Sequence, residues 1–211
     1  MFFERIFILP FLKNNLFKKH GQVKPFIPNS YLVASCLNAA FYLSHDIRRD
    51  TIVFLLFKEE DVDTLCLKFV GKNLKRFQPD ERSILGLIRN SIIRFKKRVN
   101  TCEKIKEKIQ VYPGLFVFRN SFSELLSKLK DAGYQILYPS LGGVDVRNTR
   151  FLQKIAYVTS SEGLLEEASR KIVHTRGIGV HFGNTLPRMD IQIILLHNEL
   201  DRAEKRLSNS L

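Results

Sequence analysis

The sequence predicts an α/β fold with a mostly parallel sheet, formed by a single domain that covers residues 1–211. Short runs of β-branched and aromatic residues alternate along the chain with longer runs whose apolar residues recur at helical spacing. This alternation is typical of α/β proteins built around parallel strands. A chain of 211 residues with 45% hydrophobic residues can bury a core of its own without a disulfide or a metal.

In the first half of the chain, each predicted element has its own local signal. Apolar runs predict the strands, and Asn or Asp residues before a periodic segment predict the helix starts. The predicted elements are a strand at Phe2–Leu9, a basic loop at 11–28, a helix capped by Asn29–Ser30 that runs to about Ser44, strands at Thr51–Phe57 and Thr64–Val70, and a helix from its cap Asp80 to about Val99.

The long helix after Asp80 has two distinct faces. Arg82, Arg89 and Lys96 are seven residues apart and share a solvent-side sector. This basic stripe is either an ordinary solvated face or a surface that binds phosphate. The opposite sector predicts core packing, because it holds the apolar residues Ile84, Leu87, Ile88, Ile92 and Phe95.

Glycine, proline and short apolar runs divide the second half of the chain. The Lys-rich residues 100–110 predict a solvated connection. The predicted elements that follow are a strand at Leu115–Phe118, a helix at Ser121–Ala132 ended by Gly133, a strand at Gln135–Tyr138, a Gly-bearing loop at Pro139–Arg150, a strand at Ile155–Thr159, a helix to about Arg170, a strand at Lys171–His174, a loop at Thr175–Thr185 and a last helix opened by Pro187.

The last helix is apolar almost all round between Ile191 and Leu196, with Gln192 as the exception. A helix of this kind must be covered on more than one side. We therefore expect it to form part of a homodimer interface.

The overall charge narrows the choice of partner. Lys and Arg number 34 against 21 Asp and Glu, which gives a net charge of +13. A domain this basic usually meets a polyanion, either nucleic acid or an anionic membrane surface. No stretch reaches the roughly 18 apolar residues of a membrane span, so no membrane anchoring is expected. Three cysteines without CxxC spacing predict free, buried thiols and a reducing cytoplasm, and the dispersed histidines predict no metal site.

Two charged segments carry a specific pattern. Leu43–Asp50 reads Leu-Ser-His-Asp-Ile-Arg-Arg-Asp, and residues 68–82 contain Lys-Phe-Val-Gly, Leu-Lys-Arg and Pro-Asp-Glu-Arg in that order. These segments resemble the archaeal tRNA pseudouridine-54 N1-methyltransferase family, in the SPOUT superfamily of trefoil-knotted methyltransferases. Gly143–Val146 and His197–Asp201 resemble two further elements of the family, so the resemblance covers nearly the whole chain.

The resemblance implies a SPOUT-type fold with a C-terminal trefoil knot, a homodimer, and transfer of a methyl group from S-adenosylmethionine to N1 of pseudouridine in the T-loop of tRNA. The cofactor would lie in three C-terminal loops, and the positions assigned to it are Leu137, Gly143, Thr159, Gly163 and Leu186. The chain departs from the family in the middle loop, where residues 159–163 read Thr-Ser-Ser-Glu-Gly in place of a Gly-Asp-His-x-Gly type run. It also has Asn-Thr-Leu-Pro at 184–187 in place of a Ser-Pro-Leu element, and Gln192 where the family has a cysteine.

The implied reaction suggests roles for the charged segments. Pseudouridine N1 carries a proton that must leave as the nitrogen attacks the methyl group, so a cation near the ring and a carboxylate near the proton would both help. Arg48, Arg49 and Arg82 are candidates for the cation, whereas Asp46 and Asp50 either take the proton or orient the arginines. Binding of RNA phosphates is expected at Arg48, Arg49, Lys75, Arg76, Arg82, Arg89 and Lys96. The alternatives are a SPOUT-fold RNA-binding protein without activity and a methyltransferase for another RNA.

Overall fold

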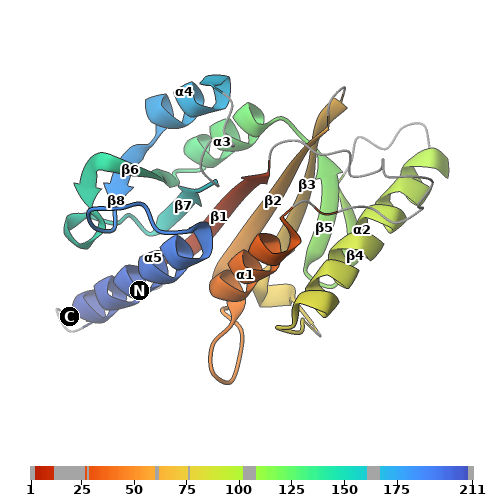
Figure 1. Ribbon diagram of the computed structural model, residues 1–211, viewed down its shortest axis with the longest axis horizontal. Helices are drawn as coiled ribbons and strands as arrows, with labels where there is room; N and C mark the ends of the chain where they lie inside the picture. Colours follow the sequence, from red (N-terminus) through yellow and green to blue (C-terminus); the bar gives the residue numbers. More distant parts are fainter. Residues whose placement is uncertain are drawn as a thin grey trace.

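The computed structural model describes residues 3–11, 27, 29–59, 62–75, 77–101, 108–160 and 167–208. Within these residues, eight strands form one sheet in the order β4-β5-β3-β2-β1-β7-β6-β8 (Figure 1). The strands are β1 (Glu4–Phe11), β2 (Thr51–Glu59), β3 (Val62–Val70), β4 (Ile109–Tyr112), β5 (Leu115–Arg119), β6 (Gln135–Asp145), β7 (Lys154–Val158) and β8 (Ile178–His181).

The predicted α/β class is confirmed, and the sheet is parallel over most of its width. β2, β1, β7, β6 and β8 pair in parallel, whereas β3, β5 and β4 continue the sheet in antiparallel pairing beyond β2. The antiparallel part follows from the short connections β2–β3 and β4–β5, because a parallel pair needs a crossover of a dozen or more residues.

Helices cover both faces of the sheet. On one face lie α1 (Ser30–Phe41), α2 (Glu81–Thr101) and α5 (Met189–Ser208), and on the other lie α3 (Phe122–Asp131) and α4 (Glu167–Arg176) (Figure 1). The central strand β1 is buried on both sides, with Phe7 and Leu9 in one core and Ile6 and Ile8 in the other. This burial explains why β1 is a nearly continuous apolar run.

The predicted helix signals are largely confirmed. Asp80 Oδ1 accepts the backbone N–H of Ser83 at 2.8 Å, as an N-cap should. Gly133, with φ 82°, follows α3 as predicted. The side-chain cap at the start of α1 is wrong: Asn29 lies in the left-handed region with φ 48°, and its side chain caps no N–H group. Cys36 and Cys66 are buried, as expected, and Cys102 lies outside the described residues.

Three predictions in the C-terminal half are wrong. The segment predicted as a glycine loop at Pro139–Arg150 continues β6 to Asp145, the strand predicted at Lys171–His174 belongs to α4, and the loop predicted at Thr175–Thr185 contains β8. The glycines here serve strand contact: a Cβ on Gly143 would lie 2.2 Å from the Gly179 carbonyl oxygen. Glycine in these strands therefore marks close backbone approach instead of a turn.

The predicted connection at 100–110 is also wrong at its end, because β4 begins at Ile109. The predicted loop at 11–28 falls almost entirely outside the described residues, as do residues 102–107.

A substitution at Gly71, in the Lys-Phe-Val-Gly motif, tests how closely the segment before α2 packs against its neighbours. A Cβ at this position would lie 2.2 Å from the Arg48 carbonyl oxygen and 2.8 Å from that of Thr51. We expect Gly71→Ala to lower the free energy of unfolding by about 1–3 kcal/mol in urea titration. The control is Gly86→Ala, where nothing lies within 4 Å of the added Cβ, and stability should stay the same or rise. Equal stability of Gly71→Ala and wild type would contradict the close approach.

Candidate functional site

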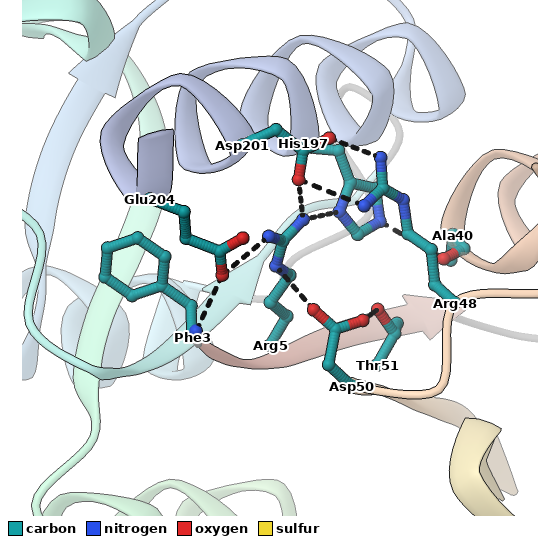
Figure 2. A network of polar contacts seen from close by, with 9 residues as sticks. All are labelled: Phe3, Arg5, Ala40, Arg48, Asp50, Thr51, His197, Asp201 and Glu204. Atoms are coloured by element: carbon teal, nitrogen blue, oxygen red, sulfur yellow. Dashed lines mark hydrogen bonds and ion pairs between the residues drawn. The ribbon is translucent and has the colours of Figure 1, made fainter. Parts of the chain in front are cut away.

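A buried arginine joins the N-terminal strand to the C-terminal helix. The Arg5 side chain is 1% exposed, and its guanidinium contacts three carboxylates (Figure 2). Nε lies 3.1 Å from Asp50 Oδ2, Nη1 lies 2.6 Å from Asp201 Oδ1, and Nη2 lies 3.0 Å from Glu204 Oε1. The Arg5 network therefore connects β1, the segment before β2 and the last turns of α5.

Arg48 belongs to the same network. It binds Asp201 through two bonds, Nη1 to Oδ1 at 3.1 Å and Nη2 to Oδ2 at 2.6 Å, and its side chain is 16% exposed. Such a two-bond pair fixes the orientation of both groups. The structure thus places the guanidinium of Arg48, a predicted catalytic residue, against α5.

His197 completes the network in its neutral form. Its Nδ1 lies 3.1 Å from Arg5 Nη1, and its Nε2 lies 3.1 Å from the Ala40 carbonyl oxygen. Because a guanidinium can only donate, Nδ1 must accept and the proton must sit on Nε2. Burial lowers the pKa of His197 well below its usual range, and the positive charges of Arg48 and Arg5 lower it further. The closing motif of the chain thus contains a neutral histidine that bridges α5 to α1.

Asp46 and Arg49 form a separate surface pair. Arg49 Nη2 lies 2.9 Å from Asp46 Oδ1, and Arg49 Nη1 donates to the carbonyl oxygens of Gly71 at 3.3 Å and Leu74 at 3.1 Å. The N–H of Ile47 and the Arg49 guanidinium both donate to the Asp46 carboxylate and lower its pKa. At 62% and 49% exposure, Asp46 and Arg49 are accessible to a ligand.

The other predicted catalytic and RNA-binding residues belong to α2 and to the segment that precedes it. Arg82 is exposed at the start of α2, and in the described part of the chain no ion pair or hydrogen bond joins it to Asp46 or Arg49. Arg89 and Lys96 are half-buried farther along α2, Lys75 is exposed, and Arg76 lies outside the described residues. The predicted core face of α2 is confirmed by the burial of Ile84, Ile88, Ile92 and Phe95 and the partial burial of Leu87.

A cavity of about 370 Å³ lies at the carboxyl end of β7, between β6, α4 and the start of α5. This is the edge of a parallel sheet where ligands commonly bind, and the volume falls within the usual range of about 300–1,000 Å³ for ligand pockets. Its walls are formed by Leu32, Tyr138, Pro139, Val158, Ser160, Arg170, Val173, His174, Leu186, Pro187, Arg188, Met189 and Gln192.

The predicted cofactor residues relate to this cavity in different ways. Leu186 lines it, whereas Leu137 and Thr159 are buried and adjoin the lining residues of β6 and β7. Gly143 contacts β8, and Gly163 lies outside the described residues.

Gln192 fixes the start of α5 to the sheet. Its Oε1 accepts hydrogen bonds from the hydroxyls of Tyr157 at 2.7 Å and Thr159 at 2.6 Å, and its Nε2 donates to the Pro187 carbonyl at 2.5 Å. A cysteine at position 192 could not make these three bonds. The amide therefore gives this chain its own way of positioning one wall of the cavity.

Sequence reasoning missed two polar residues of the cavity. The Tyr138 hydroxyl lies 2.9 Å from His174 Nδ1, and the two rings pack edge to face with 4.6 Å between their centroids. Tyr138 could have been predicted as a cavity residue, because it lies at the carboxyl end of a predicted strand, where ligands commonly bind. No local signal pointed to His174, because its segment has the composition of a strand and lies in α4.

The described residues contain no group of three potential metal ligands, and none of the helices described is long and apolar enough to cross a bilayer.

Together, these features define an α/β protein that has a cavity at the carboxyl edge of its sheet and a net charge of +13. Residues 30–205 match a family model described as "Putative SAM-dependent RNA methyltransferase". Because the match spans most of the chain, the protein belongs to this family.

Individual relatives agree with this assignment. The tRNA (pseudouridine(54)-N(1))-methyltransferase of Methanocaldococcus jannaschii is 30% identical over 171 residues, which are 81% of this chain and 82% of the relative. The enzyme of the same name from Methanococcus vannielii is 32% identical over 181 residues, 81% of this chain and 84% of the relative. The crystal structure of Archaeoglobus fulgidus Nep1 bound to S-adenosylhomocysteine shares the fold, with a TM-score of 0.53 and 12% identity over 90% of this chain and 77% of that chain.

The neutral state of His197 predicts a pH dependence of stability. Its pKa is lowered in the folded protein and is about 6.5 in the unfolded chain. The contribution of neutral His197 to the free energy of unfolding is therefore complete above about pH 6.5. It is lost as the pH falls below this value, at up to about 1.4 kcal/mol per pH unit. Between pH 7.5 and 5.5, wild type should lose about 1.4 kcal/mol more unfolding free energy than His197→Gln, measured in urea. Parallel losses in the two proteins would contradict the neutral bridge.

Proposed function

We propose that this protein transfers the methyl group of S-adenosylmethionine to N1 of pseudouridine 54 in the T-loop of tRNA. The observation that carries the proposal is the 30% identity to a tRNA (pseudouridine(54)-N(1))-methyltransferase over 81% of the chain. The net charge of +13 suits an RNA substrate, since phosphate neutralisation dominates RNA affinity.

The cavity of about 370 Å³ has the size and chemistry for the cofactor. Apolar walls from Leu186, Val158 and Val173 suit an adenine and ribose, and the hydroxyls of Ser160 and Tyr138 offer hydrogen bonds. When bound, S-adenosylmethionine supplies an electrophilic methyl group on sulfur. Leu137 and Thr159 support the strands behind the cavity. We retain Gly143, which lies in β6, and Gly163 as proposed cofactor-binding positions.

For the base site we propose Asp46 and Arg49, together with Arg82 from the exposed start of α2. The Asp46 carboxylate is exposed to solvent and, like an ordinary Asp, is ionised at neutral pH, the form that can accept a proton. The Arg49 guanidinium, already ordered by two backbone carbonyls, can stabilise negative charge on the ring. Arg48 is bound to Asp201, so its role is to hold the 42–50 segment in place.

Four finer features complete the proposal. Ile191 and Ile194 are 41% and 49% exposed on α5, and we propose that they pack against a second copy of the chain. Replacing Ile194 by Asp should then reduce the mass measured by light scattering from dimer to monomer. A C-terminal trefoil knot, as the SPOUT resemblance implies, and a place in the cytoplasm with the tRNA substrate belong to the same proposal. The RNA phosphates would contact Lys75, Arg76, Arg82, Arg89 and Lys96.

Turnover of a T-arm hairpin tests both the function and the base site. The substrate carries pseudouridine at position 54, and mass spectrometry measures the added methyl group. Asp46→Asn and Arg49→Met should each lower the turnover rate about 100-fold while the affinity for S-adenosylmethionine stays unchanged.

A hairpin with uridine at position 54 is the matched control, because N1 of uridine is bonded to the ribose and cannot be methylated. Wild-type protein that leaves the pseudouridine hairpin unmodified would overturn the proposed function. Normal turnover by both variants would overturn only the base site.

Filling the cavity tests the cofactor site. Leu186 is 40% exposed and lines the cavity, so Leu186→Trp should weaken S-adenosylmethionine binding at least tenfold in calorimetry. Leu152→Trp is the control, since Leu152 is 52% exposed and lies outside the cavity lining. Equal affinities of the two variants would place the cofactor elsewhere.

A further inference from the structure

A second hollow lies on the opposite side of α1 from the cofactor cavity. It is a groove of about 310 Å³ between the first half of α2, residues 77–78 and the end of β4, and we call it the α2 groove. The two hollows have no lining residue in common. In Figure 1, α2 and α5 lie on either side of α1, which packs against both.

The walls of the α2 groove are held from behind. The Phe77 ring stacks on Tyr42 at 5.6 Å between centroids, and the Tyr42 hydroxyl donates to the Phe77 carbonyl. Tyr112 is held by Arg94, whose guanidinium lies 4.3 Å from the ring centroid and donates to the Val111 carbonyl at 3.1 Å. A groove built in advance costs a ligand little ordering of the protein.

The lining chemistry suits a flat, polar-edged ligand. Tyr112 contributes aromatic surface and Leu87 contributes aliphatic surface, whereas the Phe77 ring is only 9% exposed and packs mainly into the core. Gln78 and Asn90 are exposed and bring two carboxamides, neither of which has a hydrogen-bond partner within the described residues. Each amide offers donors and an acceptor, the pattern that reads the edges of an unstacked nucleobase, while aromatic rings stack on its face.

Gly86 leaves room for such a ligand. It lies on the groove side of α2, and a Cβ there would meet nothing within 4 Å. Glycine inside a helix costs roughly 0.5–1 kcal/mol relative to alanine, so its presence here has no benefit for helix stability. Cationic side chains near the groove, from Arg94 and from Arg82 and Arg89 on the same helix, match the phosphates that accompany a base.

We propose that the α2 groove binds an unpaired base of the RNA substrate other than the base that is methylated. This inference rests on the proposed function, because it assumes an RNA substrate with unpaired nucleotides. The groove would read the shape of a folded loop at a distance from the cofactor cavity. Recognition of the substrate would then depend on two separated contacts of the same RNA.

The test fills the groove without disturbing the helix. Gly86→Gln adds a neutral side chain at a position free of clashes, and thermal unfolding should occur at the same or a higher temperature. Affinity for the T-arm hairpin should fall about tenfold, the effect of losing one stacked base. Affinity for a blunt duplex of the same stem, and for S-adenosylmethionine, should not change.

Two further variants sharpen the result. Ile93→Gln introduces the same side chain two turns along α2 at a half-buried position outside the groove, and should bind the hairpin like wild type. Asn90→Ala removes one carboxamide without filling the groove, and should weaken hairpin binding several-fold.

The outcomes separate this inference from the proposed function. Normal hairpin affinity of Gly86→Gln and Asn90→Ala, in a protein that methylates the hairpin, overturns the inference alone and leaves a protein segment as the occupant of the groove. Selective loss of hairpin binding by Gly86→Gln, together with a wild type that binds the hairpin but never methylates it, supports the groove and overturns the function. Absence of any hairpin binding by wild type overturns both.

Discussion

The structure depends on the burial of one guanidinium. Arg5 lies in the central strand with 1% of its side chain exposed, where a cation without partners would be strongly destabilising. Its partners come from the segment before β2 and from the last turns of α5, so the charge can be compensated only when these parts are assembled. The burial of Arg5 therefore specifies how α5 lies across the sheet.

The position of α5 in turn shapes the cavity that Leu186, Met189 and Gln192 line. Its first turn is held to β7 by Gln192, and its later turns are held to β1, α1 and the 42–50 segment by His197 and Asp201. A rigid helix fixed at both ends transmits position along its length. The Arg5 network and the cavity, which share no residue, are in this way parts of one arrangement.

The sequence alone predicted elements whose signal is local. The apolar runs of β1 and β2 and the two-faced pattern of α2 identify themselves because burial repeats along the element. The second half of β6 and the whole of β8 were not predicted, since the glycines that allow Gly143 to lie against Gly179 have the composition of a loop.

In the candidate site, too, residues within local motifs were predicted, whereas residues whose partners are distant in sequence were not. Motif resemblance drew attention to Leu186, which lines the cavity, and to Asp46 and Arg49, which form a surface pair. It could not separate Arg49 from the adjacent Arg48, whose partner Asp201 is 153 positions away. Arg5 resembles an ordinary strand-end charge until its partners in α5 are known. Contacts of this range leave no periodicity in the chain, so no local pattern predicts them.

The pairing of β1 also constrains the order in which the chain can fold during synthesis. β1 is synthesised well before β7, yet one of its two edges pairs with β7, and Arg5 finds Asp201 and Glu204 only in α5. Contacts between such distant parts form slowly, because a long loop must close before they are made. Since chains grow at roughly 5–20 residues per second, the nascent protein must keep an apolar strand half-paired for many seconds. The central sheet can therefore be completed only after β7 has been made, and the charge of Arg5 is fully compensated only after α5 follows.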